Sequence, residues 1–299
     1  MKNKAEITKI IPLFAALAAL IVAVPVRIYQ CRTIIDAATG FYNEINLSVI
    51  IFYVVVGLGA LTGLVVPYLK HNSLEPVQIS VKSTGFTVAS LIMAILLIVD
   101  SASQLLDYFS LFETVPSYNL KAYISAQGGN LLLMQAIFGA VAAVYFFVNG
   151  VTVGIGNAES SKYKVLALMP VIWCIFRLLY RFKRTISFVN VSDLLLELFL
   201  IVFSMMFFFA CAQINSKIDI NDKGGSFMKS VYWKIYGYGI PASLFALICF
   251  MPRFILTITG HSDNVNIHYP VNYSDLGFAV FAIYTCISSV RTEKKSDAE

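Results

Sequence analysis

Four charged residues flank one polar turn in an otherwise apolar part of the chain. Arg177 and Arg181 precede the turn, Asp193 and Glu197 follow it, and the members of each pair are four residues apart. Residues four apart share one face of a helix, so the two faces could meet as ion pairs or line a polar path for an ion or an anionic solute. Because unpaired charge is costly inside a bilayer, the motif indicates either helix pairing or solute handling.

The symmetry of this motif predicts which residues pair. In an antiparallel hairpin centred near Ser187, Arg181 and Asp193 both lie six residues from the centre, whereas Arg177 and Glu197 both lie ten. We therefore expect the ion pairs Arg181–Asp193 and Arg177–Glu197. The structural interpretation is a clamp on the hairpin or snorkelling to headgroups, and the functional interpretation is a polar cavity.

Two further charged candidates lie in other apolar blocks. Asp100 shares a polar stripe with Gln104 and Asp107 at the end of its block, where it either caps the helix end in loop water or belongs to a site. Arg253 directly follows Pro252, and a proline bends or breaks a helix. Broken membrane helices often line binding sites, although prolines also occur in membrane helices without such a role.

A metal site has only weak candidates. His261, Asp263 and His268 would together resemble a facial triad for a divalent metal, but a polar surface loop also carries such residues by chance. We predict no metal and no cofactor. The chain has no nucleophile elbow, zinc-protease, kinase or phosphate-loop motif, which favours a function other than catalysis.

Membrane-spanning helices must position these residues. Hydrophobic residues make up 58% of the chain and charged residues 13%, against roughly 45–50% and about 25% in soluble domains. The apolar residues form continuous blocks of about 17–25, the length of a helix that crosses a bilayer, and continuous blocks favour helices over a β-barrel. The predicted blocks are residues 10–28, 48–69, 84–106, 130–151, 165–180, 192–213, 236–259 and 275–290.

The connections between blocks are too short for a separate soluble domain, so residues 1–299 form one domain with a short charged tail at 291–299. With eight crossings both termini lie on one side. Fourteen lysines and arginines fall on that side and eight on the other, which predicts cytoplasmic termini by the positive-inside rule. The net charge of +5 favours contact with anionic headgroups over nucleic acid.

Small residues recur in two blocks and predict close helix packing of the small-xxx-small kind. The second block contains Gly57, Gly59 and Gly63, and the fourth contains Gly139 and Ala143, followed by Gly150 and Gly154.

Two short stretches carry a resemblance to a known group. Asp36 with Thr-Gly-Phe-Tyr at 39–42, and Pro-Val-Ile-Trp at 170–173 with Arg177, resemble a group of uncharacterised multi-pass membrane proteins of Firmicutes. The resemblance implies a bacterial plasma membrane and implies no activity.

The sequence thus predicts an all-α polytopic membrane bundle of about eight helices with cytoplasmic N and C termini. The leading functional hypothesis is binding or transport of a small solute or amphiphile, and the alternatives are a non-catalytic membrane scaffold or accessory subunit and a lipid-modifying membrane enzyme. The expected partners are membrane lipids, a small solute and a second copy or another membrane protein, and not nucleic acid. The candidate pathway residues are Arg177, Arg181, Asp193, Glu197, Asp100 and Arg253.

Overall fold

The computed structural model of the protein describes residues 2–70, 83–113, 120–156, 164–184, 191–215, 226–266 and 269–295. Over these ranges the chain is helical, with one isolated antiparallel bridge between Ile35 and Tyr42. The elements are α1 (Lys2–Thr33), α2 (Leu47–Leu69), α3 (Thr84–Glu113), α4 (Leu120–Ala126), α5 (Gly129–Ile155), η4 (Leu166–Leu168), α6 (Met169–Arg184), α7 (Val191–Asn215), α8 (Ser226–Ile258), η5 (Ser262–Asn264) and α9 (Tyr273–Lys295).

Six of these helices, α1, α2, α3, α5, α7 and α8, are long and apolar enough to cross a membrane. Helix α6 has 16 residues, of which four are basic, and α9 has a shorter apolar segment, Tyr273–Ser288. The prediction of an all-α membrane bundle is confirmed, and the chain is a multi-pass membrane protein. Residues 291–295 of the predicted tail continue α9 as helix.

The outer surface of the bundle is apolar, the reverse of a soluble protein. Phe14, Ile21, Leu58 and Ile95 each expose at least 60% of their surface. Many large apolar side chains on the outer surface suit contact with lipid tails. Single exposed apolar residues are common in soluble proteins and would not indicate a membrane. Eight charged residues of the described chain are buried instead, so their polar contacts lie inside the bundle; they are Arg27, Asp100, Arg177, Arg181, Asp193, Glu197, Arg253 and Asp275.

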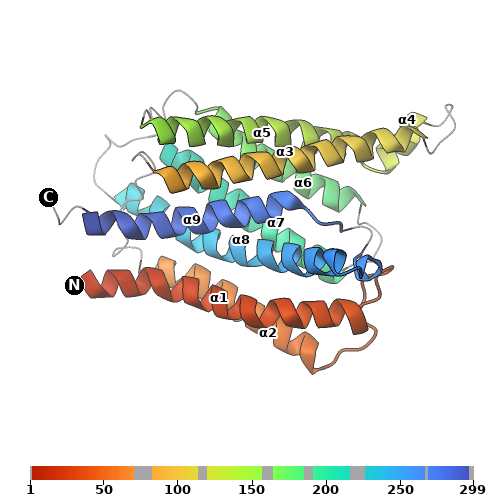
Figure 1. Ribbon diagram of the computed structural model, residues 1–299, viewed down its shortest axis with the longest axis horizontal. Helices are drawn as coiled ribbons and strands as arrows, with labels where there is room; N and C mark the ends of the chain where they lie inside the picture. The colour runs from red at the N-terminus through yellow and green to blue at the C-terminus, as the bar shows by residue number, and fades with distance from the viewer. Residues whose placement is uncertain are drawn as a thin grey trace.

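Successive long helices run in alternate directions, and α1 begins at the same end of the bundle at which α9 ends (Figure 1). Helix α8 is central, because it packs against α1, α2, α7 and α9. Within its apolar segment Trp233–Ile258, 78% of the most apolar stretch is buried. Helices α3 and α5 form the most extensive helix pair, at one edge of the bundle, and α1 and α2 lie at the opposite edge (Figure 1).

Small residues allow the close approach of α3 and α5. A Cβ atom added at Gly150 would lie 2.9 Å from Cβ of Ser90, and one added at Gly154 would lie 2.8 Å from Oγ1 of Thr87. Larger side chains at these glycines would separate the two helices. The interpretation of these small residues as a packing motif is therefore confirmed for α5.

Two helices differ from the expectations. Helix α8 continues through Pro241 and Pro252 from Ser226 to Ile258, so the broken-helix site does not form. Helix α3 extends to Glu113, beyond the expected end at 106, and its last turns lie against the start of α5.

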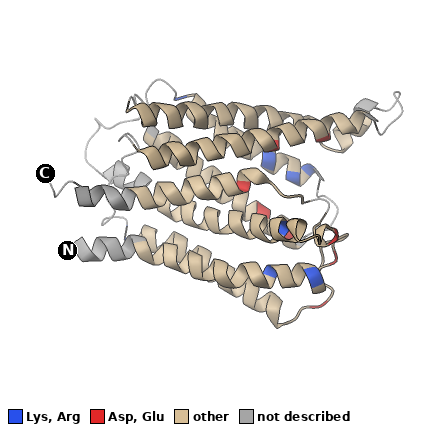
Figure 2. Ribbon diagram, viewed as in Figure 1, with Lys and Arg blue, Asp and Glu red and all other residues tan. Residues whose placement is uncertain are grey.

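Most charged residues of the described chain gather at the end of the bundle opposite the two chain termini (Figure 2). We call this the charged end. It contains the last turns of α1, α3, α6 and α8 and the first turns of α7 and α9. Arg27, Asp100, Arg181, Asp193 and Arg253 all lie there.

Candidate functional site

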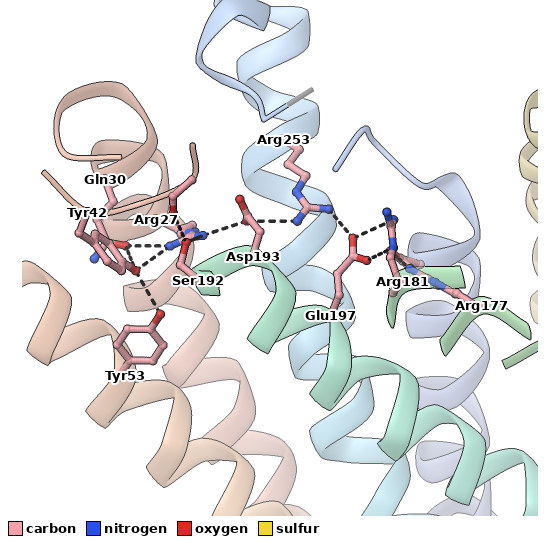
Figure 3. Close-up of polar contacts among 12 residues, drawn as sticks. Arg27, Gln30, Tyr42, Tyr53, Arg177, Arg181, Ser192, Asp193, Glu197 and Arg253 are labelled. Atoms are coloured by element: carbon pink, nitrogen blue, oxygen red, sulfur yellow. Dashed lines mark hydrogen bonds and ion pairs between the residues drawn. The ribbon is translucent and has the colours of Figure 1, made fainter. Parts of the chain in front are cut away.

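A row of alternating charges crosses the charged end and joins four helices (Figure 3). Oδ1 of Asp193 lies 2.9 Å from Nη2 of Arg27 and 3.2 Å from Nη2 of Arg253. Oε1 of Glu197 accepts a hydrogen bond from Nη1 of Arg253 at 2.9 Å, and Oε2 of Glu197 lies 2.7 Å from Nε of Arg181. We call these five residues the charge ladder; they come from α1, α7, α8 and α6.

The charge ladder is almost completely shielded. None of its residues exposes more than 7% of its surface, and Glu197 exposes none. Buried charges are tolerated only when they are paired and hydrogen-bonded, and the alternating order places each carboxylate between two guanidiniums. Two of these guanidiniums also lie over the ring of Tyr269 in the geometry of cation–π contacts. The ring centroid is 4.9 Å from Cζ of Arg181 and 5.5 Å from Cζ of Arg253.

Hydroxyl groups continue the ladder beyond Arg27 (Figure 3). Nη1 of Arg27 donates to the hydroxyl of Tyr42 at 2.8 Å, and that hydroxyl donates to the hydroxyl of Tyr53 at 3.3 Å. Burial raises the pKa of Tyr42, although Arg27 acts in the opposite direction. Tyr42 therefore stays protonated and keeps its role as a donor.

The loop before α2 gives Asp36 and residues 39–42 a structural role. The carboxylate of Asp36 accepts hydrogen bonds from Oγ1 of Thr39 at 2.7 Å and from the backbone N–H of Ala38 at 3.1 Å, and these bonds lower the pKa of Asp36. Gly40 follows with a φ of 66°, a conformation that favours glycine. The turn thus places Tyr42 against Arg27.

Arg177 lies beside the ladder and makes its own ion pair with α9. Its Nη1 and Nη2 atoms donate to Oδ1 and Oδ2 of Asp275 at 2.6 and 3.1 Å. This is the two-pronged geometry that gives arginine–carboxylate pairs their strength. Both residues are buried, and the guanidinium also lies over the ring of Trp173.

Asp100 caps a helix, but the helix is α9 and not its own. Its Oδ1 accepts from the backbone N–H of Tyr273 at 2.9 Å, and its Oδ2 accepts from that of Ser274 at 2.7 Å. The first N–H groups of a helix have no partner within the helix and carry partial positive charge. A carboxylate from α3 therefore satisfies them and fixes the start of α9.

The pairing predicted from the symmetric motif is wrong. Arg181 pairs with Glu197, and Asp193 pairs with Arg27 and Arg253. On α7, the partner of Arg181 lies one helical turn further along than the symmetric register predicts. Helices α1, α8 and α9, which lie outside the hairpin, supply partners of opposite charge for the same side chains.

Two residues of the site were missed by sequence reasoning. They are Arg27 of α1 and Asp275 of α9. Both are charged residues inside or at the edge of an apolar run, which is the same signal that marked Arg253. That signal identifies a buried charge, but it does not identify the partner.

A cavity of about 380 Å³ lies next to these ion pairs, between α3, the start of α5, the end of α6 and the segment before α9. Among the described residues that line it there is no lysine or arginine. The polar side chains of its lining come from α3, the turn before α5, the end of α6 and the segment before α9. They are Asp100, Ser103, Gln104, Asp107, Ser110, Gln127, Tyr180 and Asn272.

Several polar atoms of this cavity have no protein partner. Oε1 of Gln104 and Nδ2 of Asn272 are shielded from solvent and make no hydrogen bond within the described part of the chain. The Asp107 carboxylate likewise makes no hydrogen bond or ion pair with any residue that the structure describes. A buried polar atom without a partner costs free energy, so Oε1 of Gln104 and Nδ2 of Asn272 mark the cavity as a place where a polar guest would be stabilised. Asp107 is exposed and adds a negative charge to the cavity wall.

Two of the three candidate metal ligands lie in the described part of the chain. His261 and Asp263 lie in the turn around η5, where Nε2 of His261 is 2.5 Å from Nη2 of Arg32. A guanidinium at that distance repels a metal cation. His268 lies outside the described residues, and no group of three histidine, cysteine or acidic side chains within them has the arrangement of a metal site.

The structure thus brings Arg181, Asp193, Glu197 and Arg253 into one ladder, sets Arg177 beside it and places Asp100 at both α9 and the cavity. This geometry carries the functional interpretation alone, because no protein-family model, no curated protein and no solved structure matches the chain.

Proposed function

We propose that this chain is a single-domain, eight-span protein of a bacterial plasma membrane that binds a small polar solute at its outer face. Six helices are long enough to cross, and α6 and α9 extend in alternate directions beside them, which supports the two additional crossings. The excess of basic residues on the side of the termini supports cytoplasmic termini. The charged end and its cavity then face outward.

The single observation that carries the binding proposal is the polar cavity with unpaired atoms at its wall. Its volume of about 380 Å³ falls within the roughly 300–1,000 Å³ typical of small-molecule sites. Gln104 and Asn272 present shielded polar atoms without hydrogen-bond partners among the described residues. A protein that served only as a scaffold would gain stability from apolar or paired groups at these positions.

The charge ladder supports this site and is not the solute pathway. Each of its carboxylates lies between two guanidiniums, and Arg177 is held by Asp275. Tyr180, adjacent to the ladder, and Asn272, just before the capped start of α9, both line the cavity. Ion pairs that hold α6 and α9 therefore fix the cavity wall, as a preorganised site requires.

One observation favours the alternative of a membrane scaffold or accessory subunit. Every charge of the charge ladder is paired within the protein. Charges that only hold helices together require no bound solute. In that case the protein would act through another membrane protein or a second copy, and the cavity would have no specific occupant.

Solute-dependent unfolding of the purified protein in lipid nanodiscs distinguishes the two functions. The probes are glycerol, glycine, succinate and 1,4-diaminobutane, which represent neutral, zwitterionic, anionic and cationic solutes. We expect at least one of them to raise the unfolding temperature, because a ligand at a hundred times its Kd stabilises by about 2.7 kcal/mol.

The variant Ser103→Leu, which fills part of the cavity, is expected to abolish this rise. Its matched control is Ala102→Leu, an exposed neighbour on α3 that does not line the cavity. A wild-type protein that responds to no probe, or a response that survives in Ser103→Leu, would support the scaffold instead.

A further inference from the structure

Building on the proposed solute binding, we infer that the cavity takes a small organic cation with a primary ammonium group. The inference follows from the signs of the charges at the cavity wall, from the acceptors around them and from the size of the space.

The first step concerns charge. Two carboxylates, Asp100 and Asp107, line the cavity, and the described lining includes no basic side chain to balance them. The neighbouring guanidiniums are already used, since Arg177 pairs with Asp275 and Arg181 pairs with Glu197. A cation is therefore attracted to this space, whereas an anion would meet uncompensated negative charge.

The second step separates the two carboxylates. Asp100 accepts two backbone N–H groups at the start of α9, so its negative charge is partly offset by the positive end of that helix. Asp107 lies two helical turns further along α3, about 10 Å away along the helix axis. Asp107 is the carboxylate available to a ligand.

The third step concerns the hydrogen bonds. An ammonium group has three donors and no acceptor. Gln104, with its unpaired Oε1, lies one turn from Asp107 on the same helix, and Ser110 lines the cavity on the other side of that acid. These acceptors match a primary ammonium better than a quaternary one, which is bound by aromatic cages instead.

The fourth step concerns size. A bare metal ion prefers several oxygen ligands at short range, and no three-ligand group occurs among the residues with described positions. A space of about 380 Å³ is far larger than such an ion needs. It fits a short carbon chain that carries the ammonium, with a polar group at its other end to meet Asn272 or Gln127.

A matched four-carbon series tests the charge preference directly. Calorimetric titration of the wild-type protein in nanodiscs would compare 1,4-diaminobutane, 4-amino-1-butanol, 1,4-butanediol and succinate. We expect the two amines to bind and the diol and the dicarboxylate to bind at least about tenfold more weakly, because each lacks the charged hydrogen bond.

The variants locate the ammonium. Asp107→Asn is expected to weaken amine binding about tenfold or more, and Asp107→Glu, which keeps the charge, is expected to retain most of it. Asp263→Asn is the matched control, because Asp263 is an exposed acid at the same end that does not line the cavity; it should leave the affinity unchanged.

The outcomes separate this inference from the proposed function. Binding of the diol or succinate as tight as that of the amines, or amine binding unaffected by Asp107→Asn, would overturn the ammonium inference. Stabilisation by glycerol that Ser103→Leu removes, without any response to amines, would overturn it while the solute-binding function stood. Failure of every probe would overturn both.

Discussion

Replacement of Glu197 with glutamine is expected to destabilise the protein by about 3–5 kcal/mol, the typical cost of breaking a buried ion pair by removing one partner. Glu197 exposes none of its surface and lies between Arg181 and Arg253. Glutamine keeps the shape but removes the charge, so two buried guanidiniums would be left without their shared anion.

The free energy of unfolding in mixed detergent micelles measures this effect, together with the yield of monodisperse protein. Glu44→Gln provides the matched control, since Glu44 is exposed in the loop before α2 and should change stability by no more than about 0.5 kcal/mol. Equal stability of the two variants would show that the charge of Glu197 does not hold the bundle together.

A double-mutant cycle on Arg177 and Asp275 is expected to show the second large effect. Each single variant, Arg177→Gln or Asp275→Asn, leaves one buried charge unpaired and should cost about 3–5 kcal/mol. The double variant leaves two neutral amides that can hydrogen-bond with each other. Its loss should therefore be smaller than the sum of the single losses, by about 1–3 kcal/mol.

The same cycle on Arg177 and Glu197 tests the pairing that the sequence symmetry had predicted. These two side chains do not form an ion pair in the structure, because Nη1 and Nη2 of Arg177 both donate to the carboxylate of Asp275. We expect a clearly smaller coupling for this pair. A stronger coupling between Arg177 and Glu197 than between Arg177 and Asp275 would restore the symmetric hairpin.

The apolar pattern of the sequence predicted the helices well, because helix length and burial in lipid follow from local composition. Each of the eight apolar blocks contains an α-helix, and six of these helices are long and apolar enough to cross a membrane. Helix ends differ from the block ends by several residues where polar turns remain helical, as at the end of α3 and the start of α8. Helix α4 was not expected, since seven residues are too few for a periodic signal.

The charged residues of the site were predicted more completely than their contacts. Arg181, Asp193, Glu197 and Arg253 were all identified, because charge inside an apolar run is unusual. Their pairing depends on which helices lie side by side, and sequence spacing reports only the face of a residue on its own helix. Arg27 is more than 160 residues from its partner Asp193 in the sequence, so no local sequence pattern predicts this ion pair.

The cavity also depends on packing that the sequence does not encode locally. The sequence predicts the polar stripe of Asp100, Gln104 and Asp107, either as a helix cap in loop water or as part of a site. The stripe lines a space because the segment before α9 and the start of α5 lie across from it. Capping of α9 by Asp100 sets the position of that segment.

The most direct test of the whole account is the reaction of a membrane-impermeant maleimide with Ser103→Cys in intact cells. Ser103 is exposed and lines the cavity, whereas Ser101, two residues away, is only 3% exposed. Serine and cysteine differ little in size, so Ser101→Cys and the wild type, with its five native cysteines, are close controls.

If an open cavity faces outward beside a closed charge ladder, Ser103→Cys reacts with the maleimide in intact cells, and much faster than Ser101→Cys or the wild type. The reaction of Ser103→Cys is then slower in the presence of 1,4-diaminobutane. Reaction of Ser103→Cys only after permeabilisation, or at the same low rate as Ser101→Cys, would contradict the account.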